Sequence, residues 1–166
     1  MKTIIVSGTP GTGKTYLSKK LARKLNFYYF DVNKFVSQNI LYEGYDKKRK
    51  TSIVDVKKLN TKLIQFINFF KKNKIKKYNG IIIDSHLSHY IPKKYVHFCI
   101  ITKCDIKELN KRLKNKKFNK NKIKENLQSE IFDICLNEAK QRKHKIIVID
   151  TTKGFNINVI ARKIGG

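Results

Sequence analysis

The sequence has little of several residue types that mark particular classes of protein. Its 166 residues include three cysteines, two prolines, no tryptophan and 12 acidic residues against 38 basic ones. Three cysteines without C-x-x-C spacing argue against both a disulfide framework and a zinc site, so a reducing, cytoplasmic compartment fits best. With two prolines, no proline-rich linker divides the chain, which is most simply one domain over residues 1–166.

Long hydrophobic runs are absent as well. No stretch of about 18 apolar residues occurs, which excludes a transmembrane helix and predicts no membrane partner. The early apolar run covers only residues 4–6, so a signal peptide is not expected.

Acidic residues are scarce, and the formal net charge is +26. Such a charge is typical of proteins that bind a polyanion such as RNA, because lysines near phosphates gain from counterion release. The alternative is biased composition, since the basic residues are 33 lysines and five arginines, and RNA readers favour the planar fork of arginine. Biased composition is the preferred explanation, and an RNA-facing role stays open.

The clearest chemistry lies in residues 4–15, with the sequence IIVSGTPGTGKT. Gly8, Gly13, Lys14 and Thr15 satisfy the G-x-x-x-x-G-K-[ST] phosphate-loop pattern. Glycines allow successive backbone N–H groups to converge on phosphate oxygens at the start of a helix. Lys14 is expected to reach the β- and γ-phosphates, and the Thr15 hydroxyl to ligate Mg²⁺. The chain is therefore predicted to bind a nucleoside triphosphate.

Hydrophobic periodicity predicts that strands alternate with helices. Strands are expected at residues 4–6, 27–30, 80–84, 95–101 and 145–150. Helices are expected at 15–25, 55–77, 107–116, 122–142 and 156–164, with a short helix near 35–41 and a loop over 41–49. This alternation is typical of a three-layer α/β sandwich around a five-stranded parallel sheet.

The strand at 80–84 ends in Asp84, about 70 residues after the phosphate loop. A carboxylate in this place supports Mg²⁺ in phosphate-loop enzymes, directly or through its water. His86 follows at the carboxyl edge of the sheet, where ligands bind in open α/β folds, so it is predicted to be functional. His89 is predicted to cap or pack.

Taken together, these motifs resemble a known family. They are similar to the archaeal and nuclear adenylate kinases of the isoenzyme-6 type, which are also called ribosome-biogenesis ATPases. The matching segments, in chain order, are 7–15, 42–46, 53–55, 84–86, 122–126, 130–133, 138–139 and 150–152. The resemblance implies one P-loop nucleoside monophosphate kinase domain, with a helical NMP-binding region at about 32–55 and a short lid at about 115–125.

The resemblance also implies a reaction and roles for individual residues. Mg²⁺-ATP would donate a phosphoryl group to AMP, giving two ADP, with other monophosphates as further acceptors and an associated ATPase activity. Lys14, Asp84 and His86 would be catalytic, Thr15 and Asp84 would hold Mg²⁺, and Arg49 would clamp the NMP phosphate. The residues implied to bind ATP are Gly11, Thr12, Gly13, Lys14, Thr15, Tyr16, Lys116 and Lys153.

One departure from the family pattern lies in the lid, where residues 116–118 read Lys-Lys-Phe in place of Arg-Gly-Tyr. Lysine cannot make a planar bidentate contact, so either Lys116 acts as a point charge or Arg112, one turn earlier, contributes. Lys153 is alternatively a solvated residue that follows a strand.

Two other functions compete with the kinase. The family implies an ATP-driven assembly factor that binds a small-subunit ribosomal protein, and with it pre-ribosomal RNA, during pre-ribosome maturation. A related P-loop kinase of a small metabolite is the weaker alternative. The protein is expected to be a monomer.

Overall fold

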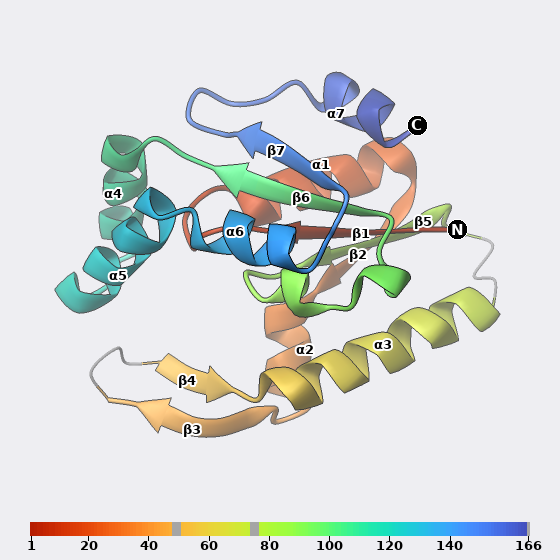
Figure 1. Cartoon of the computed structure of the whole chain (residues 1–166), viewed down its shortest axis with the longest axis horizontal. Helices are drawn as coiled ribbons and strands as arrows, with labels where there is room; N and C mark the ends of the chain where they lie inside the picture. The colour runs from red at the N-terminus through yellow and green to blue at the C-terminus, as the bar shows by residue number, and fades with distance from the viewer. Residues whose placement is uncertain (48–50, 74–76, 166) are drawn as a thin grey trace.

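The computed structural model describes residues 1–47, 51–73 and 77–165. Their centre is a five-stranded sheet with the strand order β2-β5-β1-β6-β7 (Figure 1). Its strands are β1 (Lys2–Ser7), β2 (Phe27–Asp31), β5 (Gly80–Asp84), β6 (Phe98–Lys103) and β7 (Ile146–Asp150). Every neighbouring pair runs parallel, so the predicted parallel sheet is confirmed.

Helices cover both faces of this sheet. Successive strand residues point to opposite sides, and in these strands both sets are apolar and need covering. The helices are α1 (Lys14–Leu25), α2 (Val32–Gln38), α3 (Val56–Lys72), α4 (Ile106–Asn115), α5 (Lys120–Ile131), α6 (Ile134–Gln141) and α7 (Ile157–Ile164). Ile4 and Val6 of β1 pack with α1 and α7. Ile5, between them, packs with α2, α3 and α6 on the other face. The result is the predicted three-layer sandwich (Figure 1).

Several helices begin where the sequence offers a cap. Asp31, Asp55, Asp105 and Asn119 each accept a hydrogen bond from a backbone N–H group in the first turn of α2, α3, α4 and α5. The carboxyl end of α1 is also capped: Asn26 has a φ of 52°, the left-handed conformation that ends many helices. The helices predicted to end at residue 25 and to begin near residue 55 therefore have a physical boundary at Asn26 and Asp55.

The predicted loop over residues 41–49 is wrong for most of its length. Residues Tyr42–Asp46 form β3, which pairs antiparallel with β4 (Thr51–Val54) in a hairpin separate from the main sheet. Tyrosine favours strands, but the charged residues beside Tyr42 and Tyr45 give no period-two pattern that would reveal one. The strand predicted at 95–101 also starts later, at Phe98, because Lys93–Tyr95 forms a 3₁₀ turn.

The predicted helix over residues 122–142 is two helices. α5 ends at Ile131, α6 begins at Ile134, and Asp133 between them has a φ of 52°, which a continuous helix does not allow. Ile131 and Ile134, which lie on either side of this break, are 56% and 43% exposed. The helix predicted at 55–77 also stops early, at Lys72.

The carboxyl ends of the parallel strands meet at one edge of the sheet, and α4 and α5 lie at this edge (Figure 1). Leu109 and Leu113 of α4 pack there against Phe118, Ile123 and Leu127 in a small apolar cluster of their own. Among the residues described, no helix combines the length and the apolar character needed to cross a membrane.

Candidate active site

The loop between β1 and α1 is shaped by glycines. Gly8, Gly11 and Gly13 have φ values of 140°, 96° and 83°. A Cβ on Gly8 would lie 2.5 Å from the carbonyl oxygen of Thr102, so the loop approaches β6 too closely for any side chain. Gly13 is the N-cap of α1, whose first N–H groups have no partner within the helix. The loop therefore has the backbone geometry that binds phosphate groups.

Lys14 reaches across this loop. Its Nζ donates hydrogen bonds to the carbonyl oxygens of Gly8 at 2.8 Å and Thr9 at 2.9 Å. Burial lowers the pKa of Lys14 to about 8, so the amine is still mostly protonated at pH 7. Phosphate oxygens are stronger acceptors for an ammonium group than neutral carbonyls are.

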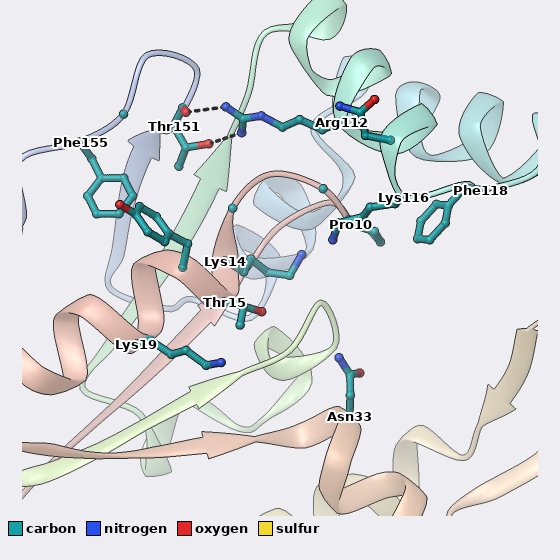
Figure 2. A pocket seen from close by; sticks show the side chains of 15 residues that line it. Pro10, Lys14, Thr15, Lys19, Asn33, Arg112, Lys116, Phe118, Thr151 and Phe155 are labelled. Carbon is teal, nitrogen blue, oxygen red and sulfur yellow. Dashed lines mark hydrogen bonds between the residues drawn. The ribbon is translucent and has the colours of Figure 1, made fainter.

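A cavity of about 1000 Å³ opens above the loop (Figure 2). Sites for small molecules and cofactors typically span about 300–1,000 Å³, so a nucleotide fits. The lining includes six of the residues predicted to bind ATP, namely Gly11, Gly13, Lys14, Thr15, Tyr16 and Lys116. Lys153 does not line the cavity, although its neighbours Gly154 and Phe155 do.

Thr12, which was also predicted to bind ATP, is buried below the loop. Its Oγ1 donates to the carbonyl oxygen of Thr9 at 2.7 Å and lies 2.6 Å from Oγ1 of Thr102. The carbonyl oxygen of Thr12 accepts a hydrogen bond from the Thr151 hydroxyl at 2.8 Å. The Thr12 side chain thus holds the loop against β6 and leaves contact with a ligand to its neighbours.

Arg112 of α4 joins the lid side of the cavity to the loop after β7. Its guanidinium donates to the hydroxyl of Thr151 at 3.3 Å and to its carbonyl oxygen at 3.0 Å (Figure 2). It also donates to the carbonyl oxygen of Thr152 at 3.2 Å. Its Nε donates to Glu108 at 2.9 Å. Because Thr151 is bonded to the phosphate loop as well, Arg112 supports the cavity wall from α4.

Two aromatic rings form another part of the wall. Tyr16 and Phe155 pack edge to face, with ring centroids 5.7 Å apart (Figure 2). Flat apolar rings of this kind suit a nucleobase. Sequence reasoning missed Phe155, and its place directly after Gly154, in a segment that follows a strand, was the only signal for it.

Asp84 lies beside the phosphate loop at the end of β5. Its Oδ2 accepts a hydrogen bond from the Tyr29 hydroxyl at 3.0 Å. Burial raises the pKa of Asp84, while the nearby hydroxyls of Thr15 and Tyr29 and the charge of Lys14 act in the opposite direction. Carboxylate and hydroxyl oxygens are ligands that Mg²⁺ prefers, so Thr15 and Asp84 fit the ion implied by the resemblance. Sequence reasoning missed Tyr29.

The two predicted histidines differ in their surroundings. The His86 side chain is exposed, but surrounding protein atoms and the charge of Lys14 lower its pKa to about 4, so it is neutral at pH 7. His89 is buried and belongs to a hydrogen-bond network under the loop. Arg49 lies outside the described residues.

A glycine loop with Lys14 and Thr15, at the carboxyl edge of a parallel sheet beside an acidic strand end, defines a P-loop protein with a kinase-type fold. Solved structures have this fold. Shikimate kinase from Acinetobacter baumannii aligns with a TM-score of 0.60 and 14% identity over 99% of this chain and 90% of that one. Deoxyadenosine kinase from M. mycoides aligns with a TM-score of 0.57 and 16% identity over the whole of both chains.

Relatives in sequence identify the family within the P-loop proteins. Residues 4–133 match the AAA domain family. The chain is 32% identical over 157 residues to a Methanocaldococcus jannaschii protein provisionally named adenylate kinase, covering 95% of this chain and 81% of that one. It is 31% identical over 147 residues to the adenylate kinase isoenzyme 6 homolog of Dictyostelium discoideum, covering 89% of this chain and 79% of that one. It is 32% identical over 148 residues to the isoenzyme 6 homolog FAP7 of Saccharomyces cerevisiae, covering 89% of this chain and 71% of that one. The chain belongs to the adenylate kinase isoenzyme 6 family.

Proposed function

We propose that this protein transfers the γ-phosphoryl group of Mg²⁺-ATP to AMP and so forms two molecules of ADP. The observation that carries the proposal is the phosphate loop, in which positive-φ glycines, the Lys14 ammonium and the start of α1 converge at the base of a nucleotide-sized cavity. The names of the family members support adenine nucleotides as the substrates.

In this proposal the triphosphate lies on the backbone of residues 11–16, and Lys14 contacts the β- and γ-phosphates. Phosphoryl transfer spreads negative charge over the γ-phosphate oxygens, and a fixed cation stabilises that charge most in the transition state. The two carbonyl groups that accept hydrogen bonds from the Lys14 ammonium belong to the loop itself. Phosphate oxygens would replace these carbonyl groups as the acceptors of the lysine.

Thr15 and Asp84 would hold Mg²⁺, which neutralises phosphate charge when it is bound. Tyr29 keeps the Asp84 carboxylate in place through its hydrogen bond to Oδ2. The neutral imidazole of His86 is the third group proposed to be catalytic, as a hydrogen-bond partner for a bound substrate.

Other contacts complete the proposal. Tyr16 and Phe155 would pack beside the adenine, and Lys153 would contact it from the segment next to Phe155. Lys116 would serve as the lid cation, and Arg49 would clamp the AMP phosphate.

The proposal is tested by measuring ADP formation from Mg²⁺-ATP with and without AMP, for the wild type and for Lys14→Ala. Lys24→Ala is the matched control, because it removes the same charge from an exposed position on α1. We expect AMP-dependent turnover in the wild type and the control, and its loss in Lys14→Ala. Full turnover in Lys14→Ala would contradict the assignment of the phosphate loop.

An ATP-driven assembly factor that binds a small-subunit ribosomal protein and pre-ribosomal RNA is the second candidate. The observation that favours it is Lys116 at the lid side of the cavity, where lysine cannot make a planar bidentate contact. The net charge of +26 fits this role as well as it fits biased composition. This function predicts ATP hydrolysis that AMP leaves unchanged and that the ribosomal protein stimulates.

A further inference from the structure

A buried hydrogen-bond network joins the phosphate loop to α6. The His89 side chain is 1% exposed, and both of its ring nitrogens have partners. Nδ1 lies 2.7 Å from Oγ of Ser7, and Nε2 lies 2.8 Å from Oε2 of Glu138. Ser7 is the last residue of β1 and directly precedes Gly8 of the phosphate loop. The network therefore connects the start of this loop to a helix on one face of the sheet.

We propose that His89 is a positioning residue, which holds Ser7 and the segment around His86 in the arrangement that phosphoryl transfer requires. The proposal rests on the kinase activity proposed above for the same site. It adds a residue that touches neither nucleotide and acts through Ser7 and Glu138.

The partners of Glu138 determine where the protons lie. Its Oε1 accepts a hydrogen bond from the Tyr90 hydroxyl at 2.8 Å, and an ionised carboxylate can accept a second one from His89 at Oε2. The imidazole Nε2 is then the donor. In a neutral imidazole the other nitrogen, Nδ1, is an acceptor, and its donor is the Ser7 hydroxyl.

The Ser7 hydroxyl has a second acceptor within reach, because its Oγ lies 3.2 Å from the carbonyl oxygen of His86. One hydroxyl carries one proton, so it serves either His89 or the His86 carbonyl group. With neutral His89, the Ser7 proton is directed to Nδ1 and the shorter contact is the hydrogen bond. A change in His89 would thus alter the contact between the phosphate loop and the segment that carries His86.

The groups that face His89 favour its neutral form. Burial lowers the pKa of His89, the Glu138 carboxylate acts against this, and the positive charge of Arg142 lowers the pKa further. The net direction is downward, so His89 is neutral at pH 7. His144 also bonds to the His89 carbonyl oxygen at 3.0 Å, which holds the backbone of this residue.

The fold does not depend on this network alone. The Ser85 N–H group donates to the carbonyl oxygen of Val6 at 3.2 Å, and the Ser88 hydroxyl donates to the same oxygen at 3.1 Å. The segment therefore stays attached to β1 when His89 is replaced. For this reason we expect replacement to change turnover more than folding.

The test compares His89→Leu and His89→Asn with His97→Gln. His97 is the matched control, because its Nδ1 accepts a hydrogen bond from Thr3 N at 3.0 Å, near the opposite end of β1. We expect His89→Leu to lower kcat about tenfold, since small displacements at a reacting centre are costly, while KM for ATP stays within about twofold. His89→Asn should recover part of the loss, and His97→Gln should keep the wild-type kcat. A kcat of His89→Leu within about twofold of the wild type would overturn the proposal.

A second variant and an NMR measurement test the proposal independently of whether His89→Leu folds. If His89→Leu does not fold, Glu138→Gln tests the same link from a partly exposed position, and an unchanged kcat in that variant overturns the proposal. The ¹⁵N NMR spectrum of wild-type histidines at pH 7 should show a neutral His89 with its proton on Nε2. A proton on Nδ1 would contradict the arrangement even if AMP-dependent turnover, and with it the proposed function, were absent. If AMP-dependent turnover is absent, the rate of ATP hydrolysis without AMP becomes the readout for the variants.

Discussion

Replacement of Gly8 by alanine tests the geometry of the phosphate loop directly. The φ of 140° lies in a region that residues with a side chain rarely adopt, and the new Cβ would lie 2.5 Å from the Thr102 carbonyl oxygen. The backbone conformation costs on the order of 1–3 kcal/mol. The distance between the Cβ and this oxygen must increase to at least 3.0 Å, and forced shifts of this kind cost a further ~1–3 kcal/mol. We expect Gly8→Ala to lose about 2–6 kcal/mol of stability.

Gly154→Ala is the matched control. Gly154 also has a positive φ, 97°, but an added Cβ would meet no atom within 4 Å. The control therefore carries the backbone cost without the overlap, and the difference between the two variants should be about 1–3 kcal/mol. For a chain of this length, that difference lowers the Tm of Gly8→Ala by at least about 2 °C below the Tm of the control.

Denaturant unfolding gives the stability of both variants, and titration with a fluorescent ATP analogue gives the affinity. We expect Gly8→Ala to bind the analogue at least about tenfold more weakly, because its displaced N–H groups no longer converge on phosphate. Gly154→Ala, which leaves the phosphate loop unchanged, should lose less affinity than Gly8→Ala does. Equal destabilisation of the two variants, with unchanged affinity in Gly8→Ala, would refute this reasoning.

Three further predictions concern charge at the site. Lys14→Ala should lower kcat by at least about a hundredfold, as expected for loss of a group that stabilises transition-state charge, and steady-state ADP formation measures this. The ratio kcat/KM for ATP should fall as pH rises through about 8, because the protonated Lys14 is the competent form below that pH and is lost above it; a profile that stays flat to pH 9.5, about 1.5 units above, would contradict this. Lys116→Arg should raise the AMP-dependent rate by restoring a planar fork at the lid, whereas an unchanged rate would mean that Lys116 is not the lid cation.

The parts of the fold that were predictable depend on local signals. The phosphate loop follows from the glycine spacing, and the central strands follow from short apolar runs such as residues 80–84, which are buried on both faces. The helix break at Asp133 was not predictable, because apolar residues continue at helical spacing across it. Its cause is tertiary: Lys103, at the end of β6, bonds to the Asp133 carboxylate and to the Glu130 carbonyl group.

The same distinction applies to the site. Lys14, Thr15 and Asp84 could be predicted, since each belongs to a motif whose spacing has a chemical reason. Tyr29 and Phe155 could not, because their roles arise when β2 lies beside β5 and when the segment after β7 folds back onto α1. For His89, the sequence predicted a structural role but not the residues that it contacts. Its partners Ser7 and Glu138 are 82 and 49 residues away in the chain.

The most direct test of the proposed function is ADP formation from Mg²⁺-ATP at fixed salt concentration, with AMP titrated into the reaction. We expect a large rise in rate that saturates with AMP and disappears in Lys14→Ala. A slow rate of ATP hydrolysis that does not respond to AMP would contradict the kinase, and stimulation by a small-subunit ribosomal protein would then identify the assembly factor.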